Sequence, residues 1–464
     1  MSGFTTLVAV VLFLLSLTIE TLAQQIADGQ IAVVSNLRAG AAKADVTPAI
    51  VPGLNTTGHV RPVDGVRDPL HVGVLLLDDG VTRAAIVTSD FVDAGDLWVR
   101  VAREAVATEA KVSKANVMVT ASHNHSALKL EDHPNWLTNV STKIGSAARQ
   151  AATNMRTVSI GYGVDAIQFG INRRKTIDGR SVVNLNPQGP NDPRVKVLRF
   201  DDGNSLTPVA ILMHAVCHPC FFTWGDKGTH PYPNGYPKIS ADFPGEAQRF
   251  VEMCYAQKTC ALFVQGCAGD IRPNLPGYPY RCADEADIQW AGRDLGGAVI
   301  RSCAYAAIRE QVRQRESYYP IRVASQIVDL PGKNGSVQAE LMAMKIGPFL
   351  FLTMPGEPMV EFGFKLETAI ADRAIPFVLG YANGSIGYIA TADSHLVGGY
   401  EPNKCPLTPE AEKVLLGHLG QLADQVIGDV FESFSKHPKD LLKREAEARE
   451  RLEISNPKPS KTDR

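Results

Sequence analysis

Two histidines lie two residues apart at the end of an apolar run, in the segment Val117-Met118-Val119-Thr120-Ala121-Ser122-His123-Asn124-His125. The apolar run is typical of a buried strand, and alternate residues of a strand point to the same face. His123 and His125 can therefore aim at one point. Neutral imidazole binds zinc, copper, iron and nickel, so the pair predicts a corner of a metal site. The alternative is that one histidine makes a local hydrogen bond and the other lies on the surface.

Two further segments end an apolar strand with a potential metal ligand. The first, His214-Ala215-Val216-Cys217-His218-Pro219, has two histidines at a spacing that would share a helix face. The proline after His218 disfavours helical geometry there, so we expect an extended chain with only one of the two histidines pointing inward. The second, Leu352-Thr353-Met354-Pro355-Gly356-Glu357, stops at Pro-Gly and presents a carboxylate. Glu357 could equally bind a metal or cap the helix that follows it, because acidic side chains favour helix starts.

Strands and helices alternate along the part of the chain that positions these segments. Apolar runs predict strands at residues 72–77, 84–88, 208–214, 261–265, 321–330, 341–346, 349–354 and 376–380. Helical periodicity predicts helices at residues 97–108, 246–257, 285–316, 360–372 and 410–434. No Pro/Ser/Gly-rich linker and no internal repeat interrupts residues 38–435. We therefore predict one large α/β domain, with mixed multi-stranded sheets and flanking helices.

Both ends of the chain differ in composition from this domain. Residues 7–18 are almost wholly apolar but short for a membrane span, and Thr21-Leu22-Ala23 offers a small residue at a cleavage point. Residues 1–23 therefore predict a signal peptide; an uncleaved anchor is the alternative, because no Lys or Arg precedes the apolar run. Residues 436–464 are highly charged, which predicts a solvated helix or a disordered tail. We expect a protein that is secreted, periplasmic or at the cell surface.

Charge and cysteine content bear on the partners and on the redox state. The net charge is −2 with an isoelectric point near 6.6, and no basic stripe is present, so nucleic acid is not an expected partner. Export favours disulfides, since thiols outside the cytosol tend to pair. A pair between Cys254 and Cys260 is the simplest expectation because only a short loop separates them, and the other pairings stay open. The eight cysteines are at 217, 220, 254, 260, 267, 282, 303 and 405.

Taken together, these segments resemble the catalytic region of the neutral/alkaline ceramidase family, zinc amidases that hydrolyse the N-acyl bond of ceramide. The resemblance covers residues 38–435, and it implies a single neutral-ceramidase-like catalytic domain. The matching motifs occur in the order of the family: Gly40-Ala41-Ala42-Lys43-Ala44-Asp45-Val46-Thr47-Pro48, Asp68-Pro69-Leu70, Leu77-Asp78-Asp79-Gly80, Ser122-His123-Asn124-His125-Ser126, Phe169-Gly170-Ile171-Asn172-Arg173, Ile239-Ser240-Ala241-Asp242-Phe243-Pro244-Gly245 and Gly266-Cys267-Ala268-Gly269-Asp270-Ile271-Arg272-Pro273-Asn274.

Carried over position by position, the resemblance implies a set of zinc ligands. His123 and His218 match zinc-binding histidines, and Glu357 matches the carboxylate ligand. His395 lies where the family has a tyrosine ligand. Histidine is itself a good zinc ligand, but it lacks the phenol's ability to stabilise an oxyanion or donate a proton. His214 matches no role in the family, so we interpret it as a hydrogen-bonded core histidine.

The resemblance also implies catalytic neighbours of the zinc. His125 and Arg173 match residues that orient and stabilise the tetrahedral intermediate. Arg272 departs from the family, whose ceramidases have a serine before Pro-Asn. A zinc-activated water does not require that serine, because metal binding brings the pKa of the water to about 7. Arg272 either holds an anionic group of the substrate or pairs with Asp270 as a structural bridge.

The function implied is that of a secreted, zinc-dependent amidohydrolase that cleaves the N-acyl amide of ceramide or of a related N-acyl compound. The family's ceramidases continue into a C-terminal β-sandwich, whereas this sequence ends about thirty residues after its last predicted helix. Without that sandwich, we expect membrane-embedded ceramide to be a less secure substrate. Two alternatives are a zinc hydrolase of another polar amide or ester, and a non-catalytic metal-binding extracellular protein. The expected partner is a small, lipid-like N-acyl molecule, and a peripheral contact with a membrane is compatible with it.

Overall fold

The computed structural model describes residues 34–57, 62–203, 207–221, 238–274, 283–311 and 316–428. The predicted signal peptide, the predicted tail and Cys282 lie outside these ranges. Within the described ranges every helix is too short or too polar to cross a membrane. The helices are α2 (Asp96–Ala110), α3 (Pro134–Thr153), α4 (Asp242–Cys254), α5 (Glu285–Gln311), α6 (Val360–Ile370), α7 (Ala392–Val397), α8 (Tyr400–Lys404) and α9 (Ala411–Ile427).

The larger sheet has eight strands and combines antiparallel pairs with a parallel pair at each edge. Each parallel pair is connected through a helix, α2 between β5 and β6 and α4 between β11 and β13, as parallel strands require. From one edge to the other the strands are β13 (Cys260–Gln265), β11 (Pro208–Ala215), β10 (Arg194–Asp202), β7 (Arg156–Ala166), β2 (Arg38–Asp45), β4 (His71–Asp78), β5 (Arg83–Ser89) and β6 (Val117–Val119).

The remaining described strands form a four-stranded sheet, a three-stranded sheet and three two-stranded pairs. The four-stranded sheet has the order β16 (Ile321–Leu330), β17 (Val337–Ile346), β18 (Phe349–Thr353) and β20 (Ile375–Leu379). A three-stranded sheet has the order β14 (Ile271–Pro273), β8 (Gly170–Ile177) and β9 (Arg180–Asn186). The two-stranded pairs are β19 (Glu357–Pro358) with β21 (Tyr388–Ile389), β12 (Lys238–Ile239) with β3 (Gly65–Val66), and β1 (Val34–Ser35) with β15 (Glu316–Ser317).

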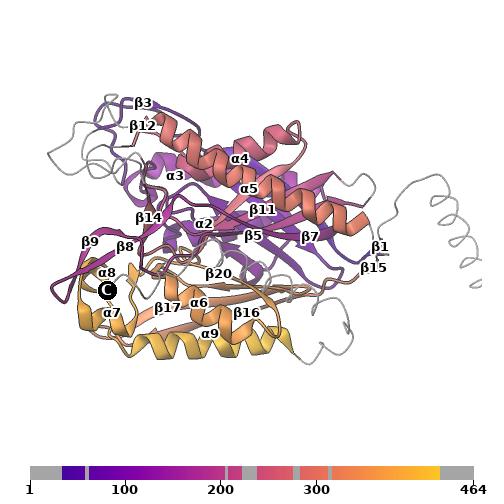
Figure 1. Cartoon of the computed structure of the whole chain (residues 1–464). Coiled ribbons are helices and arrows are strands. Elements are labelled where there is room, and N and C mark those ends of the chain that lie inside the picture. Colours follow the sequence, from indigo (N-terminus) through magenta and orange to yellow (C-terminus); the bar gives the residue numbers. More distant parts are fainter. Residues whose placement is uncertain are drawn as a thin grey trace, which may run out of the picture.

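The two large sheets and their helices form four layers (Figure 1). Helices α2, α3, α4 and α5 cover one face of the eight-stranded sheet, and the four-stranded sheet covers the other face. Helices α6 and α9 cover the outer face of the four-stranded sheet. This arrangement confirms the predicted α/β fold of mixed, multi-stranded sheets with flanking helices.

Each layer boundary is an apolar core. On α3, the buried side chains of Trp136, Val140, Ile144 and Ala148 recur every four residues and face the eight-stranded sheet. Between the two sheets, aromatic and aliphatic side chains of both interdigitate. On α9 the side chains of Leu415, Leu419, Leu422 and Val426 are buried against the four-stranded sheet. Three separate apolar clusters therefore hold the four layers together.

The eight-stranded sheet curls so that its two edges approach each other. β2 and β7 share only two residue pairs, so the sheet is weakly joined at its centre. Leu262 on β13 lies against Gly73 on β4, although four strands separate them in the sheet. A Cβ atom on Gly73 would lie 2.5 Å from Leu262 Cδ2, so any other residue at position 73 would displace the Leu262 side chain. The curl brings the C-terminal ends of β6 and β13, the two edge strands, to the same place.

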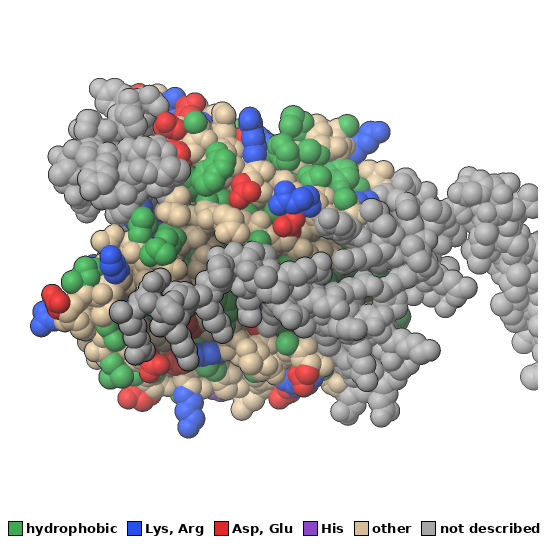
Figure 2. All heavy atoms as spheres, viewed as in Figure 1, with side chains coloured by type: hydrophobic (Ala, Val, Ile, Leu, Met, Phe, Trp, Pro, Cys, Tyr) green, Lys and Arg blue, Asp and Glu red, His purple; other side chains and the backbone are tan. Residues whose placement is uncertain are grey.

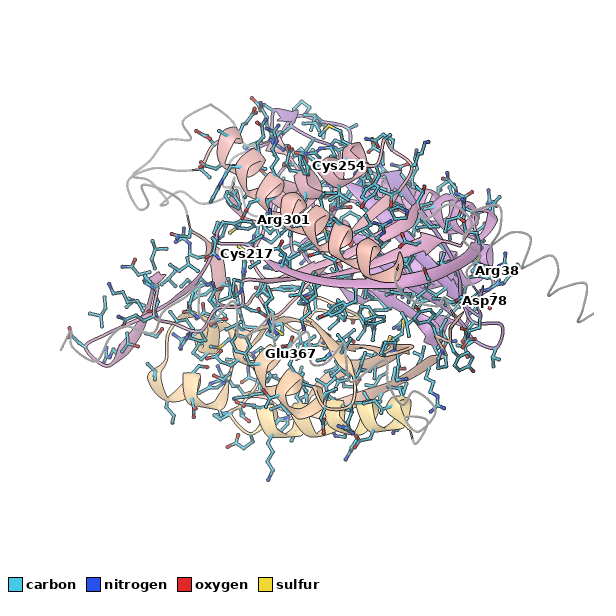
Figure 3. The ribbon with its side chains drawn as sticks, turned by 45° about the vertical axis from the view of Figure 1, so that its right-hand side comes forward. Arg38, Asp78, Cys217, Cys254, Arg301 and Glu367 are labelled. Carbon is cyan, nitrogen blue, oxygen red and sulfur yellow. The ribbon has the colours of Figure 1, made fainter. Side chains whose placement is uncertain are left out.

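The predicted disulfide between Cys254 and Cys260 is wrong. Both residues are free thiols, and no disulfide joins any two of the described cysteines. Cys254 ends α4 and is exposed on the helical layer (Figure 3), whereas Cys260 is the first residue of β13 and lies beside Lys43 and Glu252. A short loop in sequence therefore separates side chains that belong to different layers.

Candidate metal centre

The ends of three strands converge on one site. His123 follows β6, His218 follows β11 and Glu357 follows β18, so both large sheets contribute to it. The chain after β6 also pairs with the chain after β20, through an isolated bridge from Thr120 to Ala382, which fixes the two sheets to each other here. Figure 3 shows Cys217, the residue before His218, at the opposite end of the sheet from Arg38 and Asp78.

His123 is held in one orientation by a backbone carbonyl. Its Nδ1 lies 2.7 Å from the carbonyl oxygen of Val92, and because a carbonyl only accepts, Nδ1 carries the proton and Nε2 keeps its lone pair. The ring of Tyr381 stacks on the imidazole with the centroids 4.2 Å apart. The backbone of His123 is left-handed, with φ of 67°, and that of Tyr381 is too, with φ of 54°. Such strained backbone is typical of a functional site.

His218 is held in the same way from the other sheet edge. Its Nδ1 lies 2.6 Å from the carbonyl oxygen of Ala268 and 3.0 Å from that of Ile271, so Nε2 is again the nitrogen with a free lone pair. That Nε2 atom is buried and has no hydrogen-bond partner among the described residues. Burial and the charge of Arg173 lower the pKa of His218 to about 4, so the ring is neutral at neutral pH.

Glu357 faces both of these nitrogens. Its Oε2 lies 3.1 Å from Nε2 of His123 and 3.5 Å from Nε2 of His218. Burial alone would raise the pKa of Glu357, but its contacts with the two histidines lower that pKa well below its usual range. The helix that follows, α6, begins at Val360, and its N-cap is Met359 and not Glu357. Of the two open interpretations, the position of Glu357 therefore favours the metal ligand over the helix cap.

His125 completes a group of three histidines. Its Nε2 lies 3.1 Å from Nε2 of His123, and the three rings of His123, His125 and His218 bring one nitrogen each within 4.8 Å of the others. Burial, together with the neighbouring His123 and His218, lowers the pKa of His125 well below its usual value. The predicted residues His123, His125, His218 and Glu357 are thus brought together.

The spacing of these donor atoms fits a single zinc ion. Ligand bonds of about 2.0–2.1 Å in a tetrahedron put neighbouring donor atoms about 3.3–3.4 Å apart. The distances that join His123 Nε2 to His125 Nε2, His123 Nε2 to Glu357 Oε2 and His218 Nε2 to Glu357 Oε2 are 3.1, 3.1 and 3.5 Å. His123 and His218 also each donate the Nδ1 N–H to a backbone carbonyl, which is the usual support for a metal-binding histidine.

Arg173 lies beside this group and is fixed by its own contacts. Its guanidinium donates to Glu401 Oε1 at 2.8 Å, to the Gly269 carbonyl at 2.7 Å and to the Tyr388 hydroxyl at 3.0 Å. Burial alone would lower the pKa of Arg173, but Tyr388 and Glu401 raise it above its usual value, so the side chain stays charged. A buried cation with a fixed direction can stabilise negative charge that develops nearby.

Tyr388 was not expected at the site from the sequence. It is the register partner of Glu357 in the β19–β21 pair, which sets the two side by side. Its buried hydroxyl receives the hydrogen bond from Arg173, and burial raises the pKa of Tyr388 well above its usual value. The only signal in the sequence was the short Gly387-Tyr388-Ile389 segment, too brief to reveal its pairing with Glu357.

Two other predicted residues have different surroundings. His395 does not join the histidine group: it lies on α7, and the charged groups around it are Lys333, Glu410 and Arg174. The chain between Tyr388 and Glu401 folds into two short helices, so a position matched by counting residues need not face the ligands. His214 is buried with Nε2 3.2 Å from the Val378 carbonyl, which confirms its interpretation as a core histidine.

Arg272 is fully buried on β14, next to β8. The carboxylate of Asp270 accepts hydrogen bonds from Asn172 Nδ2 and from the backbone N–H of Val360, both at 2.8 Å. These contacts satisfy Asp270, and the two roles considered for Arg272, a bridge to Asp270 or a contact with an anionic group of the substrate, both stay predictions.

Two solved structures with a similar fold are ceramidases. The neutral ceramidase from Pseudomonas aeruginosa matches with a TM-score of 0.69 over 84% of this chain and 74% of that chain, at 17% sequence identity. A ceramidase complexed with C2 matches with a TM-score of 0.67 over 83% of this chain and 74% of that chain, also at 17% identity. No protein-family model and no curated protein sequence matches the chain. The domain is therefore neutral-ceramidase-like in fold.

Proposed function

We propose that this protein is a zinc-dependent amidohydrolase that cleaves the N-acyl amide bond of ceramide or of a related N-acyl lipid. One observation carries the proposal: Nε2 of His123 and Nε2 of His218 both face Oε2 of Glu357, while each Nδ1 is satisfied by a backbone carbonyl. Such an arrangement leaves buried lone pairs that a divalent cation would satisfy.

His123, His218 and Glu357 would hold the zinc. When bound there, zinc is a Lewis acid that polarises a carbonyl and supplies hydroxide at neutral pH. The low pKa of Glu357 and the neutral state of His218 suit this role, because metal ligands must be deprotonated. His125 Nε2 lies 3.1 Å from His123 Nε2, close enough for His125 to be a further metal ligand or to contact the substrate. The zinc content of a His125→Ala variant distinguishes these two roles.

The other residues act on the substrate. Hydrolysis adds water across the C–N bond, places negative charge on the former carbonyl oxygen and requires a proton on the leaving amine. Arg173, held by Glu401, would stabilise that negative charge, and the Tyr388 hydroxyl that accepts its hydrogen bond would help to keep the guanidinium in position. His125, neutral and next to His123, would orient the substrate or transfer the proton to the amine.

The N-acyl lipid substrate rests on the fold and not on a bound ligand. Both structural neighbours are named ceramidases, but at 17% identity the substrate of this chain is a proposal. Arg272, which replaces the family's serine, is buried beside the site and would alter the preference for the head group. We also propose export, on the strength of the apolar leader at residues 1–23.

Two measurements on the purified protein test the proposal. Elemental analysis should find about one zinc per chain, and a fluorogenic N-acyl sphingosine should be cleaved in a chelator-sensitive reaction. A panel of N-acyl sphingosines, N-acyl amino acids and sugar esters separates the lipid substrate from a polar amide or ester. Zinc without turnover on any member of the panel would support a non-catalytic metal-binding protein and contradict the enzyme.

A further inference from the structure

The two candidate zinc-binding histidines differ in the number of contacts that fix their rings. His218 Nδ1 lies 2.6 and 3.0 Å from two backbone carbonyls, those of Ala268 and Ile271. His123 Nδ1 has one such partner, the Val92 carbonyl at 2.7 Å. Histidine side chains hardly appear on the described surface in Figure 2, which agrees with the burial of both rings. Because a single hydrogen bond lets a ring pivot about that contact, a second contact is required to keep Nε2 of His123 in one direction.

Tyr381 supplies this second contact. Its ring stacks on the His123 imidazole, with the centroids 4.2 Å and the planes 28° apart. The rings of His125 and His218 meet His123 edge-on instead, at interplanar angles of 81° and 78°. Of the described rings in contact with His123, only that of Tyr381 therefore lies over its face, where it opposes rotation about the Nδ1 hydrogen bond.

The backbone of Tyr381 is strained in a way that places this ring. Its φ of 54° lies in the left-handed region, which a bulky side chain rarely adopts. The Tyr381 N–H donates to the Gly356 carbonyl at 2.8 Å, and the Tyr381 carbonyl accepts from the Ala121 N–H at 3.0 Å. Gly356 directly precedes Glu357, and Ala121 lies two residues before His123. The two chain segments that carry these candidate ligands thus hold Tyr381 in a conformation of the kind that persists at functional sites.

The ring of Tyr381 makes these contacts and its hydroxyl does not. The residue is 1% exposed, and its hydroxyl oxygen has no hydrogen-bond partner among the described residues. The face of an aromatic ring is electron-rich and attracts positive charge. An imidazole that binds a divalent cation gains positive charge, so the stacked ring favours the metal-bound form of His123 over the free form. A phenylalanine ring would present the same face.

We propose that Tyr381 is a positioning residue whose ring raises the zinc affinity of the site by holding the His123 imidazole toward Glu357. The inference rests on the metal centre of the proposed function and is independent of catalysis. Tyr381→Met and Tyr381→Leu remove the ring but keep an apolar side chain, and either should weaken zinc binding about 10–100-fold, as loss of other groups that orient metal-binding histidines does. Tyr381→Phe keeps the ring and should bind zinc like the wild type.

Zinc affinity of the full chain is measured by competition with a chromophoric chelator, and the visible spectrum of the cobalt-substituted protein reports the ligand geometry. The spectrum should change in Tyr381→Met and stay unchanged in Tyr381→Phe. Tyr162→Met is the matched control, because it removes another buried tyrosine ring, packed against Phe349 and Phe377 between the two large sheets. Thermal denaturation should show a loss of stability in Tyr381→Met and in Tyr162→Met, whereas zinc affinity should fall only in Tyr381→Met.

The outcomes separate the ring from its hydroxyl and from general stability. Wild-type zinc affinity in a folded Tyr381→Met or Tyr381→Leu protein, or an equal loss in Tyr381→Phe, would overturn the proposal. The same loss in Tyr162→Met would overturn it too, because affinity would then follow stability. Zinc binding that depends on the Tyr381 ring in a protein that cleaves no amide would support the inference and reject the proposed function. A wild-type protein that binds no zinc would reject both.

Discussion

Gln265 and Ser122 are joined by a hydrogen bond, from Gln265 Nε2 to the Ser122 carbonyl at 3.1 Å, across the two opposite edges of the eight-stranded sheet. The same Nε2 atom donates to the Cys217 carbonyl at 2.7 Å. Ser122 and Cys217 are the residues immediately before His123 and His218. One buried amide therefore sets the separation of the two chain segments that carry the candidate zinc ligands.

Replacing this amide should weaken metal binding. Gln265→Met keeps the length of the side chain but removes both donors, and loss of such support typically costs about 10–100-fold in metal affinity. A competition titration with a chromophoric chelator measures the zinc affinity, and the visible spectrum of the cobalt-substituted protein reports the ligand geometry. Gln248→Met, another buried glutamine whose amide faces Asp90, is the matched control. Equal zinc affinity in the two variants would contradict the positioning role of Gln265.

Single histidine substitutions should separate metal binding from catalysis. His123→Ala removes a ligand whose Nε2 faces Glu357, so we expect loss of both zinc and turnover. His125→Ala should keep most of the zinc and lose turnover, about 10²–10⁴-fold if the imidazole transfers a proton. Elemental analysis and activity on one N-acyl substrate are measured on the same preparations.

The control for these variants is His395→Ala. Because His395 lies on α7 among Lys333, Glu410 and Arg174, its loss should leave zinc content and turnover close to wild type. Loss of zinc in His125→Ala would make His125 a third histidine ligand, in agreement with the 3.1 Å separation of its Nε2 from that of His123. Loss of zinc in His395→Ala would contradict the placement of the site altogether.

From the sequence, the residues that meet at the candidate site were predicted better where they follow strands than where they lie in short helical segments. His123, His218 and Glu357 each follow an apolar strand, and such strands are recognised from their composition alone. His395 was matched to the family's tyrosine ligand by counting residues between Tyr388 and Glu401. Such a count does not show the direction in which a side chain on a short helix points. Helix α3 also escaped prediction, because Ser, Thr and Asn fill its exposed face and several small residues its buried one.

Tertiary contacts explain what else the sequence could not reveal. The curl of the eight-stranded sheet depends on a contact between Gly73 and Leu262. These residues are 189 positions apart in the sequence, and no local pattern encodes a contact over that separation. The register of Glu357 with Tyr388 depends on a strand pair of only two residues on each side. Short strands of this kind have no periodicity to detect. The disulfide predicted from the short spacing of Cys254 and Cys260 was wrong for a related reason. The two residues are close in sequence but belong to different layers of the fold.

Removing the Tyr388 hydroxyl should lower turnover without loss of metal. Tyr388→Phe deletes the acceptor of the 3.0 Å hydrogen bond from Arg173, so the guanidinium loses one of the contacts that direct it. We expect turnover to fall about 10²-fold, comparable with the loss of one oxyanion donor, at unchanged zinc content. Tyr400→Phe is the control, because Tyr400 meets Arg173 through its ring and keeps that ring. Similar losses in both variants would show that the aromatic packing matters and the Tyr388 hydroxyl does not.

Asp90 should make the stability of the protein depend on pH. Burial raises the pKa of Asp90 to about 7, although its carboxylate accepts a hydrogen bond from the His71 N–H at 2.8 Å. Between pH of about 4 and about 7 the folded state keeps a proton on Asp90 that the unfolded state has released. The contribution of Asp90 to the free energy of unfolding therefore declines as pH rises through this range, by up to about 4 kcal/mol, and is constant above it.

Asp90→Asn isolates this contribution, because asparagine has a similar shape and cannot ionise. Its carbonyl oxygen can accept from the His71 N–H, whereas its amide N–H meets Gln248 Nε2, which donates to the carboxylate at 3.5 Å in the wild type, so the Gln248 amide has to turn over in the variant. Urea denaturation at several pH values gives the free energy of unfolding of each protein. The value for the wild type minus that for Asp90→Asn should fall between pH of about 4 and about 7, since the other titrating groups cancel in the difference. Asp132→Asn, at an exposed acidic residue, serves as the control, and a difference that rises with pH would mean that Asp90 is ionised in the folded protein.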